Sequence, residues 1–403
     1  MAKQKKILIL AAGLVQVHLI KEAKRLGYYV ITADYLPDNP GHKFADEWYN
    51  VSTTDKEGVL ALAKRLQVDG ICTYASDVSA PTVAYVAEQL GLPGNPYLSV
   101  LTLTKKDLFR KFLREHGFNV PKARSFKSLE AAIKAKDEFR LPVMVKPVDS
   151  AGTKGVNKLT DWNQLPKLVE DAINHSIDKR FIIEEFIEKQ GYQISGDAFS
   201  FNGELVFSSF GSEFYSEKMI KDFCPLGEFW PSAMEDKYIE LLRADLQRLF
   251  TLLNMRTTEY NVEAIVGKDR KLYLIEVAAR AGGSLIPQMI QYVTGVNTLP
   301  WIIKAAVGDL DSIETTGVGE HTCIANYMLH SNATGHYVRT VFDSNFEKNH
   351  LLYWESNVQV GELVHKFRDA GDGFGELIMR FDNLEQMQAM LPELDKFMNV
   401  EVN

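Results

Sequence analysis

The chain has 403 residues, of which 46% are hydrophobic and 24% are charged, and its formal net charge is -8. This length exceeds what one compact core normally holds, so roughly two to four domains are expected. Because binding to a phosphate backbone needs clustered cations, the acidic balance and the lack of any lysine- or arginine-rich block exclude nucleic acid as an expected partner.

Cysteine usage and the N-terminal segment bear on the compartment. The chain has 3 cysteines, Cys72, Cys224 and Cys323, which lie far apart and form no C-x-x-C pair. We therefore expect neither a disulfide framework nor a cysteine-rich zinc site, and a reducing cytoplasm fits best. The start KQKKILILAAGLV is similar to a secretion signal, but no small-residue cleavage site follows, so we interpret it as a buried first strand. No apolar run approaches the roughly 18 residues of a membrane span, and no membrane partner is expected.

Residues 1–103 are predicted to form an α/β domain, because apolar strands alternate with segments of helical spacing. The strands are expected at Lys6 to Leu10, Tyr28 to Asp34 and Gly70 to Ser76, and the helices at Val17 to Gly27, Lys56 to Leu66 and Pro81 to Leu90. This alternation predicts a Rossmann-like parallel sheet with helices on both faces.

The rest of the chain is predicted as α+β. In residues 104–185 we expect helices at Lys105 to His116, Ser128 to Phe139 and Trp162 to Asn174, and strands at Arg124 to Phe126, Val143 to Lys146 and Phe181 to Glu185. In residues 186–310 we expect strands at Tyr192 to Phe201, Glu204 to Gly211, Glu259 to Val266 and Lys271 to Val277, with a helix at Asp236 to Leu253. Residues 311–403 form a strand-rich tail that ends in a helix from Leu384 to Phe397.

The loop KPVDSAGTKGV (146–156) follows the apolar run LPVMV. Its glycines allow close backbone approach, so its N–H groups are able to surround an anion. It lacks the spacing of a Walker A loop, and the chain has no G-x-G-x-x-G fingerprint. Taken alone, the loop fits a hairpin turn with solvated lysines equally well.

Two glutamates, Glu263 and Glu276, each lie inside an apolar strand of the segment EYNVEAIVGKDRKLYLIEVAAR. The turn GKDRK makes these strands a hairpin, and residues of like parity then share a face. A buried carboxylate is costly unless it is paired or binds a metal, so the pair suggests a Mg²⁺ site beside Arg280. The alternative, weighed equally on these residues alone, is a salt bridge from Glu276 to Arg280 or Lys271.

The chain resembles the ATP-grasp carboxylate–amine ligases, including carbamoyl-phosphate-synthase-like and L-amino acid ligase-like members, along roughly residues 1–310. The motifs that carry the resemblance come in the family's order: a helix lysine ahead of Gly117 and V-P, the strand lysine of VMVKP, the glycine loop, the hinge EEFI, and two strand glutamates followed by Arg280. The resemblance implies a pre-ATP-grasp domain at 1–103, a small lobe at 104–185, a large lobe at 186–310 and a C-terminal subdomain at 311–403.

The resemblance also implies a role for each matching residue. Lys106, with Lys105 as the less favoured register, would contact the nucleotide phosphates, and Lys146 would bind the α- and β-phosphates. Glu263 and Glu276 would hold one or two Mg²⁺ ions, for which Mn²⁺ substitutes. Arg280 would steady the transferred phosphoryl group, with Lys154 as a second catalytic candidate. The remaining nucleotide-binding candidates are Ser150, Gly152, Thr153 and Gly155 in a loop over the β- and γ-phosphates, and Glu184, Glu185, Phe186 and Ile187 in a hinge that reads adenine largely through the backbone of Glu185 and Ile187.

The chain departs from the family's pattern at two positions. Ala278 replaces the usual asparagine two residues after the second glutamate, so either a water or a substrate oxygen would take that ligand position, or a second Mg²⁺ would bind more weakly. Gln193 replaces the glutamate that usually binds ribose; its amide is still able to contact a ribose hydroxyl, and Glu188 is the alternative.

Weaker candidates lie outside these motifs. Asp77 and Ser79 follow a strand at the carboxyl edge of the first sheet, where such sheets bind ligands. Lys218 and Lys221 lie in a long loop that fits either a lid or a solvated surface. The helix after Arg280 directs its N-terminal amides to the acyl-phosphate end of the cleft, or is a plain helix start.

These inferences predict a ligase that uses ATP and Mg²⁺ to turn a carboxylate into an acyl phosphate and couples it to an amine, with an amino-acid or peptide product. The alternatives are a carboxylase that activates bicarbonate, a non-catalytic nucleotide sensor suggested by Ala278 and Gln193, and a nicotinamide-dependent oxidoreductase suggested by Asp34 after the first turn. The expected partners are small carboxylates and amines, and the sequence leaves a homodimer open.

Overall fold

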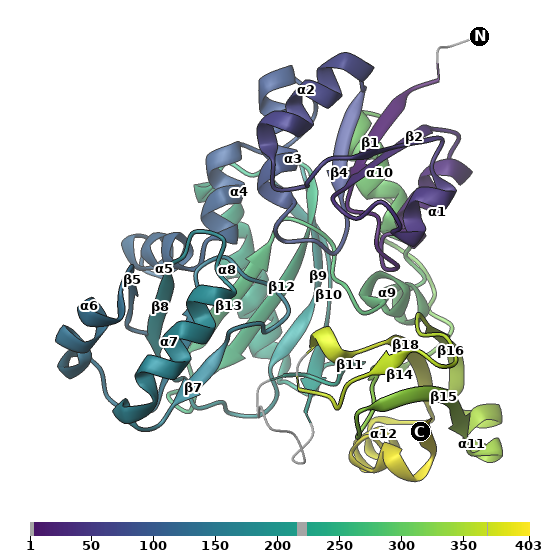
Figure 1. The fold of residues 1–403 in the computed structure, drawn as a ribbon. Helices are drawn as coiled ribbons and strands as arrows, with labels where there is room; N and C mark the ends of the chain where they lie inside the picture. The colour runs from purple at the N-terminus through teal and green to yellow at the C-terminus, as the bar shows by residue number, and fades with distance from the viewer. Residues whose placement is uncertain (1–3, 216–223, 369) are drawn as a thin grey trace.

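The computed structural model describes residues 4–215, 224–368 and 370–403. It contains an N-terminal parallel sheet, a small antiparallel sheet, and a large antiparallel sheet that continues into the C-terminal part of the chain (Figure 1). The predicted mixture of an α/β domain with α+β lobes is confirmed. Among the described residues, no helix combines the length and the apolar character needed to cross a membrane.

The N-terminal sheet is parallel throughout. Its order is β3-β2-β1-β4, built from β1 (Lys6–Leu10), β2 (Tyr29–Asp34), β3 (Glu47–Asn50) and β4 (Gly70–Thr73). Helix α1 (Val17–Arg25) packs on one face, and α2 (Lys56–Leu66) and α3 (Ala80–Leu90) pack on the other. Helix α10 (Leu299–Val307), from the end of the range 186–310, joins α1 on its face (Figure 1). Strand β3 was not predicted, because EWYN is a half-exposed edge strand without an apolar run.

The small lobe follows two helices, α4 (Tyr97–Thr104) and α5 (Lys106–Glu115). Its antiparallel sheet has the order β5-β8-β6-β7, with β5 (Ala123–Phe126), β6 (Val143–Pro147), β7 (Asn157–Leu159) and β8 (Phe181–Glu185). Helices α6 (Leu129–Lys134) and α7 (Leu165–Asn174) bury its apolar face. Since β6 and β8 are neighbours, the strand that carries Lys146 lies beside the strand that leads into the hinge.

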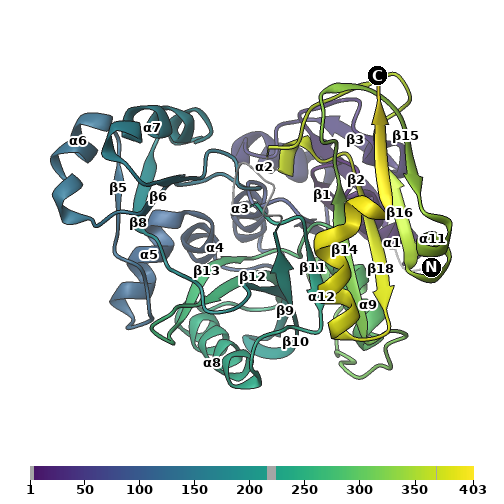
Figure 2. The same cartoon turned by 90° about the horizontal axis from the view of Figure 1, so that it is seen from below.

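The large sheet has eight strands in the order β13-β12-β9-β10-β11-β14-β18-β16. They are β9 (Ile194–Phe201), β10 (Glu204–Phe214), β11 (Gly227–Trp230), β12 (Thr258–Val266), β13 (Leu272–Ala278), β14 (Cys323–Leu329), β16 (Leu351–Ser356) and β18 (Gly375–Phe381). Helix α8 (Asp236–Leu252) packs on the core beneath the strands β9, β12 and β13, and α9 (Ile286–Thr294) packs near β9 and β14. Figure 2 shows the small lobe at one end of the molecule and the C-terminal strands at the other.

The C-terminal region thus extends the large sheet and adds a small one, formed by β15 (Gly335–Phe342), β17 (Leu363–Val364) and β19 (Met398–Val402). Helix α11 (Ser344–Asn349) precedes β16. The predicted terminal helix from Leu384 to Phe397 is wrong in its second half: α12 (Leu384–Met390) stops, and a 3-10 segment (Leu391–Lys396) leads into β19. Pro392 contributes to the break because it supplies no N–H for the helix, and the backbone leaves the helical region at Glu393, with φ of -112° and ψ of 15°.

Candidate functional site

A cavity of about 340 Å³ lies where the small lobe, the large sheet and the C-terminal region meet. Its walls hold most of the residues predicted from the sequence: Lys106, Lys146, Ser150, Gly152, Thr153, Glu184, Glu185, Phe186, Ile187, Gln193, Glu263, Glu276 and Arg280. Two predicted residues do not line it. Lys154 is exposed, and Gly155 is buried where an added Cβ would lie 2.8 Å from Cγ of Pro147.

The hairpin predicted from Glu263 and Glu276 is confirmed. Strands β12 and β13 are antiparallel neighbours, and the two glutamates are direct cross-strand partners, so their side chains share one face. Burial and the neighbouring carboxylates of Glu213 and Glu276 raise the pKa of Glu263 well above its usual range. For Glu276, the cations of Lys106 and Arg280 outweigh the effect of burial and lower the pKa. One member of the pair is therefore balanced by cations and the other is not.

Lys146 belongs to a buried cluster of three charged residues, and the arginine of this cluster also reaches the large sheet. Its ammonium contacts Oε1 of Glu184, and Oε2 of Glu184 accepts a hydrogen bond from Nε of Arg110 at 2.9 Å. Arg110, from α5, is 1% exposed and also donates to the carbonyl of Ile275 at 3.0 Å, next to Glu276. Although burial raises the pKa of Glu184, the charges of Arg110 and Lys146 bring it down to about 2. The side chain of Glu184 therefore positions the ammonium of Lys146. The predicted contacts of the hinge with adenine are separate from this role, because they involve the backbone.

The structure gives the two candidate lysines at the start of α5 different surroundings. Nζ of Lys106 lies 3.4 Å from Oε2 of Glu276 and donates to the carbonyl of Ser150 at 3.0 Å, inside the cavity. Lys105 instead forms salt bridges with Asp149 and Asp178, at 2.7 and 2.8 Å. The favoured register, Lys106, is the one that lines the cavity.

The loop over the cavity contains three residues in the left-handed region: Gly152, Thr153 and Gly155, with φ of 66°, 58° and 71°. Such a backbone turns successive N–H groups to one side, as an anion-binding nest requires. The hydroxyl of Thr153 approaches the thiol of Cys224 at 3.6 Å. Lys218 and Lys221, from the loop after β10, lie outside the described residues.

The backbone of the hinge is only partly available to a ligand. The N–H of Glu185 donates to the carbonyl of Lys122 at 2.9 Å, whereas the backbone of Ile187 has no hydrogen-bond partner among the described residues. Lys158 lies over the ring of Phe186 at 4.1 Å. Glu188 is turned away to Lys268, at 2.5 Å, and does not line the cavity.

Arg280 lies at the opposite end and is held by the N-terminal domain. Its Nη2 and Nε lie 2.6 and 2.7 Å from Oδ1 of Asp77, which also lines the cavity. Ser79 is fully buried and bonds to the hydroxyl of Ser76, so it does not reach the cavity. The predicted contribution of the first sheet therefore falls on Asp77, which fixes the guanidinium of Arg280.

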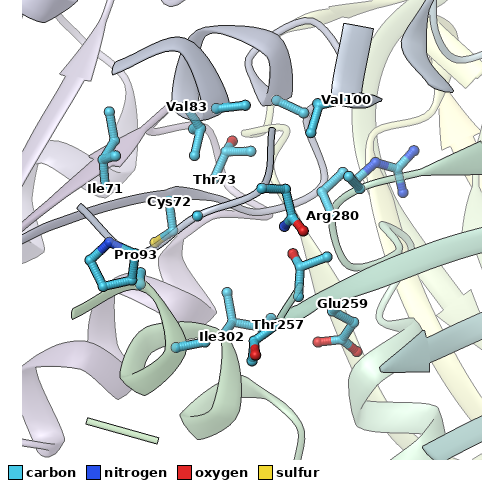
Figure 3. Close-up of a pocket in the computed structure, with 18 of the residues that line it drawn as sticks. Ile71, Cys72, Thr73, Val83, Pro93, Val100, Thr257, Glu259, Arg280 and Ile302 are labelled. Atoms are coloured by element: carbon cyan, nitrogen blue, oxygen red, sulfur yellow. The ribbon is translucent and has the colours of Figure 1, made fainter. Parts of the chain in front are cut away.

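A second cavity of about 60 Å³ lies behind Arg280, between the N-terminal sheet and β12, with Cys72, Thr73 and Glu259 on its walls (Figure 3). Small-molecule pockets usually measure at least about 300 Å³, so this cavity does not fit a dinucleotide. The carboxylate of Asp34, the residue that suggested a nicotinamide cofactor, is occupied by the protein itself. It accepts hydrogen bonds from the backbone N–H groups of Ala12 and Leu36 at 2.9 and 3.0 Å. The geometry gives the oxidoreductase alternative no support.

Carboxylates that sequence analysis did not single out line the cavity near the C-terminal strands. Glu213 on β10 and Glu228 on β11 are direct cross-strand partners, and neither forms a salt bridge with a described lysine or arginine. Glu228 accepts a hydrogen bond from the amide of Asn326 at 2.7 Å. Burial raises the pKa of each glutamate to about 7. Their motifs, FGSEF and GEFW, carry no signal beyond a glutamate within an apolar strand.

A Mg²⁺ ion fits the oxygen donors at Glu263 and Glu276, and its charge would offset the burial and the carboxylate repulsion that raise the pKa of Glu263. Among the described residues, no group of three or more histidine, cysteine or acidic side chains is arranged as a metal site. A further oxygen is available nearby. Asn261 lines the cavity directly opposite Ala278, and its Oδ1 has no hydrogen-bond partner in the described part of the chain, whereas its Nδ2 binds Oδ1 of Asp197 at 3.0 Å.

The comparison with protein families agrees with this geometry. Residues 139–288 match the family model described as "ATP-grasp domain". The chain therefore contains an ATP-grasp domain, and this segment includes the loop, the hinge, both strand glutamates and Arg280.

Curated relatives are similar in sequence to parts of the chain. The carbamoyl phosphate synthase large chain of Pseudothermotoga lettingae is 26% identical over 300 residues, which cover 70% of this chain and 27% of the relative. A formate-dependent phosphoribosylglycinamide formyltransferase of Prochlorococcus marinus is 27% identical over 190 residues, covering 46% of this chain and 48% of that protein. The chain thus spans about a quarter to a half of the length of these relatives.

Solved structures match the whole fold. An L-amino acid ligase from Bacillus licheniformis superposes with a TM-score of 0.82 at 19% identity, and a phosphoribosylglycinamide synthetase from Anaerococcus prevotii with 0.75 at 20% identity. Both matches cover 100% of this chain and 100% of the other. At this identity they establish the fold and nothing more.

Proposed function

We propose that the protein is an ATP-dependent ligase that joins a small carboxylate to an amine and releases ADP and phosphate. The observation that carries the proposal is the convergence on one cavity of Lys106, Lys146, the glycine loop, the Glu263–Glu276 pair and Arg280. Phosphoryl transfer needs positioned cations and amide dipoles more than it needs a protein nucleophile, and this cavity offers them.

In the proposed reaction the hinge holds adenine, and Lys106 and Lys146 bind the phosphates. A substrate carboxylate oxygen attacks the γ-phosphorus, the bond to the β–γ bridging oxygen breaks, and ADP leaves. The amine then attacks the acyl carbon, the bond to phosphate breaks, and the amine loses a proton. Arg280, fixed by Asp77, would neutralise the charge that develops on the transferred group.

Glu263 and Glu276 would hold Mg²⁺, with the free amide oxygen of Asn261 taking the place left by Ala278. When bound, the ion neutralises charge on the terminal phosphates. Mn²⁺ is expected to substitute, since the donors are all oxygen. A closed loop of residues 150–155 would exclude water from the acyl phosphate.

The test is to incubate the protein with Mg-ATP and pools of amino acids, other small carboxylic acids and bicarbonate, and to separate the nucleotides. We expect ADP and phosphate to rise only with a particular pool of carboxylate and amine. Release of AMP and pyrophosphate would contradict the acyl-phosphate route. ADP release that depends on bicarbonate would favour the carboxylase, and binding of ATP without any turnover would favour a sensor.

A further inference from the structure

The register of the large sheet sets the course of a bound nucleotide, provided that ATP binds as proposed above. Lys189, just after the hinge, forms an isolated antiparallel β-bridge with Gly267 at the end of β12. The N–H of Gln190 donates to the carbonyl of Val266. Glu263, the proposed metal ligand, lies three residues further along β12, which is about 10 Å at the rise of a strand. The ribose of a bound nucleotide would therefore lie along the cavity wall between Val266, next to the hinge, and Glu263.

Glu213 lies at that intermediate level. Ile194 of β9 is paired with Ala264, so Gln193 stands beside the stretch of β12 between Val266 and Glu263. The N–H of Glu213 bonds the carbonyl of Gln193 at 3.0 Å, which places Glu213 next to it on β10. Glu213 is only 2% exposed, and it lines the cavity.

The hydrogen bonds around Gln193 show which group has free capacity. Its Nε2 donates to Oε1 of Glu213 at 2.9 Å and to Oε2 of Glu263 at 3.1 Å. Both amide hydrogens of Gln193 are therefore used, which leaves it only one oxygen to accept from a ligand, and the hydroxyl of Tyr215 donates to the other oxygen of Glu213. A carboxylate has about four acceptor sites, so Glu213 keeps about two after these bonds.

We propose that the carboxylate of Glu213 accepts the two ribose hydroxyls of the bound nucleotide, and that Gln193 and Tyr215 position this carboxylate. A vicinal diol offers two O–H donors, which match the two remaining acceptor sites. Glu213 is then a binding residue that selects ribonucleotides, whereas Gln193 is a positioning residue.

The charges explain why an amide occupies position 193. A glutamate there would meet the carboxylates of Glu213 and Glu263 at hydrogen-bond distance, and like charges that close repel. The glutamine instead donates to both. Glu213 also stands opposite Glu228, an arrangement that costs stability in a sheet and is compensated when a ligand supplies donors.

The proposal is tested by the dissociation constants of Mg-ATP and Mg-2′-deoxy-ATP, measured by calorimetry. The wild type should prefer ATP by about tenfold, the loss expected when a hydrogen bond to a charged group is removed. In Glu213→Gln the preference should fall to about twofold, mainly because ATP binds more weakly. A Glu213→Gln protein that keeps the full preference would overturn the proposal, and so would a wild type without preference.

Matched variants separate binding from structure. Glu228→Gln removes the cross-strand carboxylate and should keep the tenfold preference, whereas loss of preference there would point to a general electrostatic effect and refute the assignment. Gln193→Glu should weaken both nucleotides, and the exchange Gln193→Glu with Glu213→Gln should restore part of the preference. Because the ratio is measured on bound protein, partial unfolding does not move it. A wild type that binds neither nucleotide would contradict the proposed function itself.

Discussion

Glu184 lies between two cations at the end of the cavity formed by β6 and β8, whereas Glu213 and Glu228 face each other at the end formed by β10 and β11. The pKa of Glu184 is about 2, while those of Glu213 and Glu228 are each about 7. All three side chains are buried, so the difference comes from their partners. The first region, which we call the cationic region together with Lys106, has its carboxylate balanced by cations without a ligand. The second, the carboxylate region, is balanced only when a ligand brings hydrogen-bond donors or positive charge.

The largest expected effect tests the cationic region. Lys106→Met should lower kcat/KM for ATP about a hundredfold or more, the usual cost of removing a donor to developing charge. Lys105→Met is the matched control, because Lys105 is tied to Asp149 and Asp178 outside the cavity. It should retain activity within about threefold. Equal losses in steady-state kinetics would mean that the two lysines are not distinguished by the cavity.

The second effect concerns stability of the same region. Arg110→Met leaves Glu184 with one cation, and breaking a buried pair typically costs about 3 kcal/mol or more. Urea unfolding should show this loss. Arg114→Met, on the exposed side of the same helix, should cost less than about 1 kcal/mol. A similar loss in both variants would contradict the role of Arg110 as the link between the lobes.

A smaller effect is expected where the N-terminal domain meets the cavity. Asp77→Asn keeps a polar partner for Arg280 but removes the charge that fixes it. We expect kcat to fall about tenfold while the dissociation constant of ATP stays unchanged, since the guanidinium acts on the transferred group. Pre-steady-state and binding measurements separate the two. A change confined to ATP binding would move Arg280 to the nucleotide site.

The smallest effect tests the carboxylate region through pH. The pKa of Glu213 is about 7 in the folded protein, above its ordinary value of 4.5. The folded state therefore holds a proton that the unfolded chain releases, so stability falls as pH rises from about 4.5 to about 7. Glu213→Gln removes this loss, and its Tm relative to wild type should rise by a few degrees between pH 5 and pH 8. A constant difference across this range would contradict the raised pKa.

The sequence predicted the parts of the site that local pattern encodes. Glu263 and Glu276 were placed together because strand periodicity and the turn GKDRK determine the hairpin and its register. The parallel N-terminal sheet followed from alternation of strands and helices in the same way. For the loop and hinge, the order of motifs placed Lys146, Ser150 and Ile187 in one cavity.

The missed residues depend on long-range packing. Arg110 lies in an amphipathic helix where a charged residue normally faces solvent, and only the fold brings it to Glu184, 74 residues away. Glu213 and Glu228 face the cavity because β11 pairs with both β10 and β14. Asn261 becomes a candidate metal ligand only because the strand register places it opposite Ala278. No local pattern encodes such pairings.

The most direct test of the contrast between the two regions is a calorimetric titration with ATP in Mg²⁺ and in EDTA. If the cationic region holds the phosphates while the Glu263–Glu276 pair and the carboxylate region repel them without a cation, ATP should bind in Mg²⁺ and lose at least about tenfold in affinity in EDTA. Equal affinity under both conditions, or no binding in Mg²⁺, would contradict this account of the cavity.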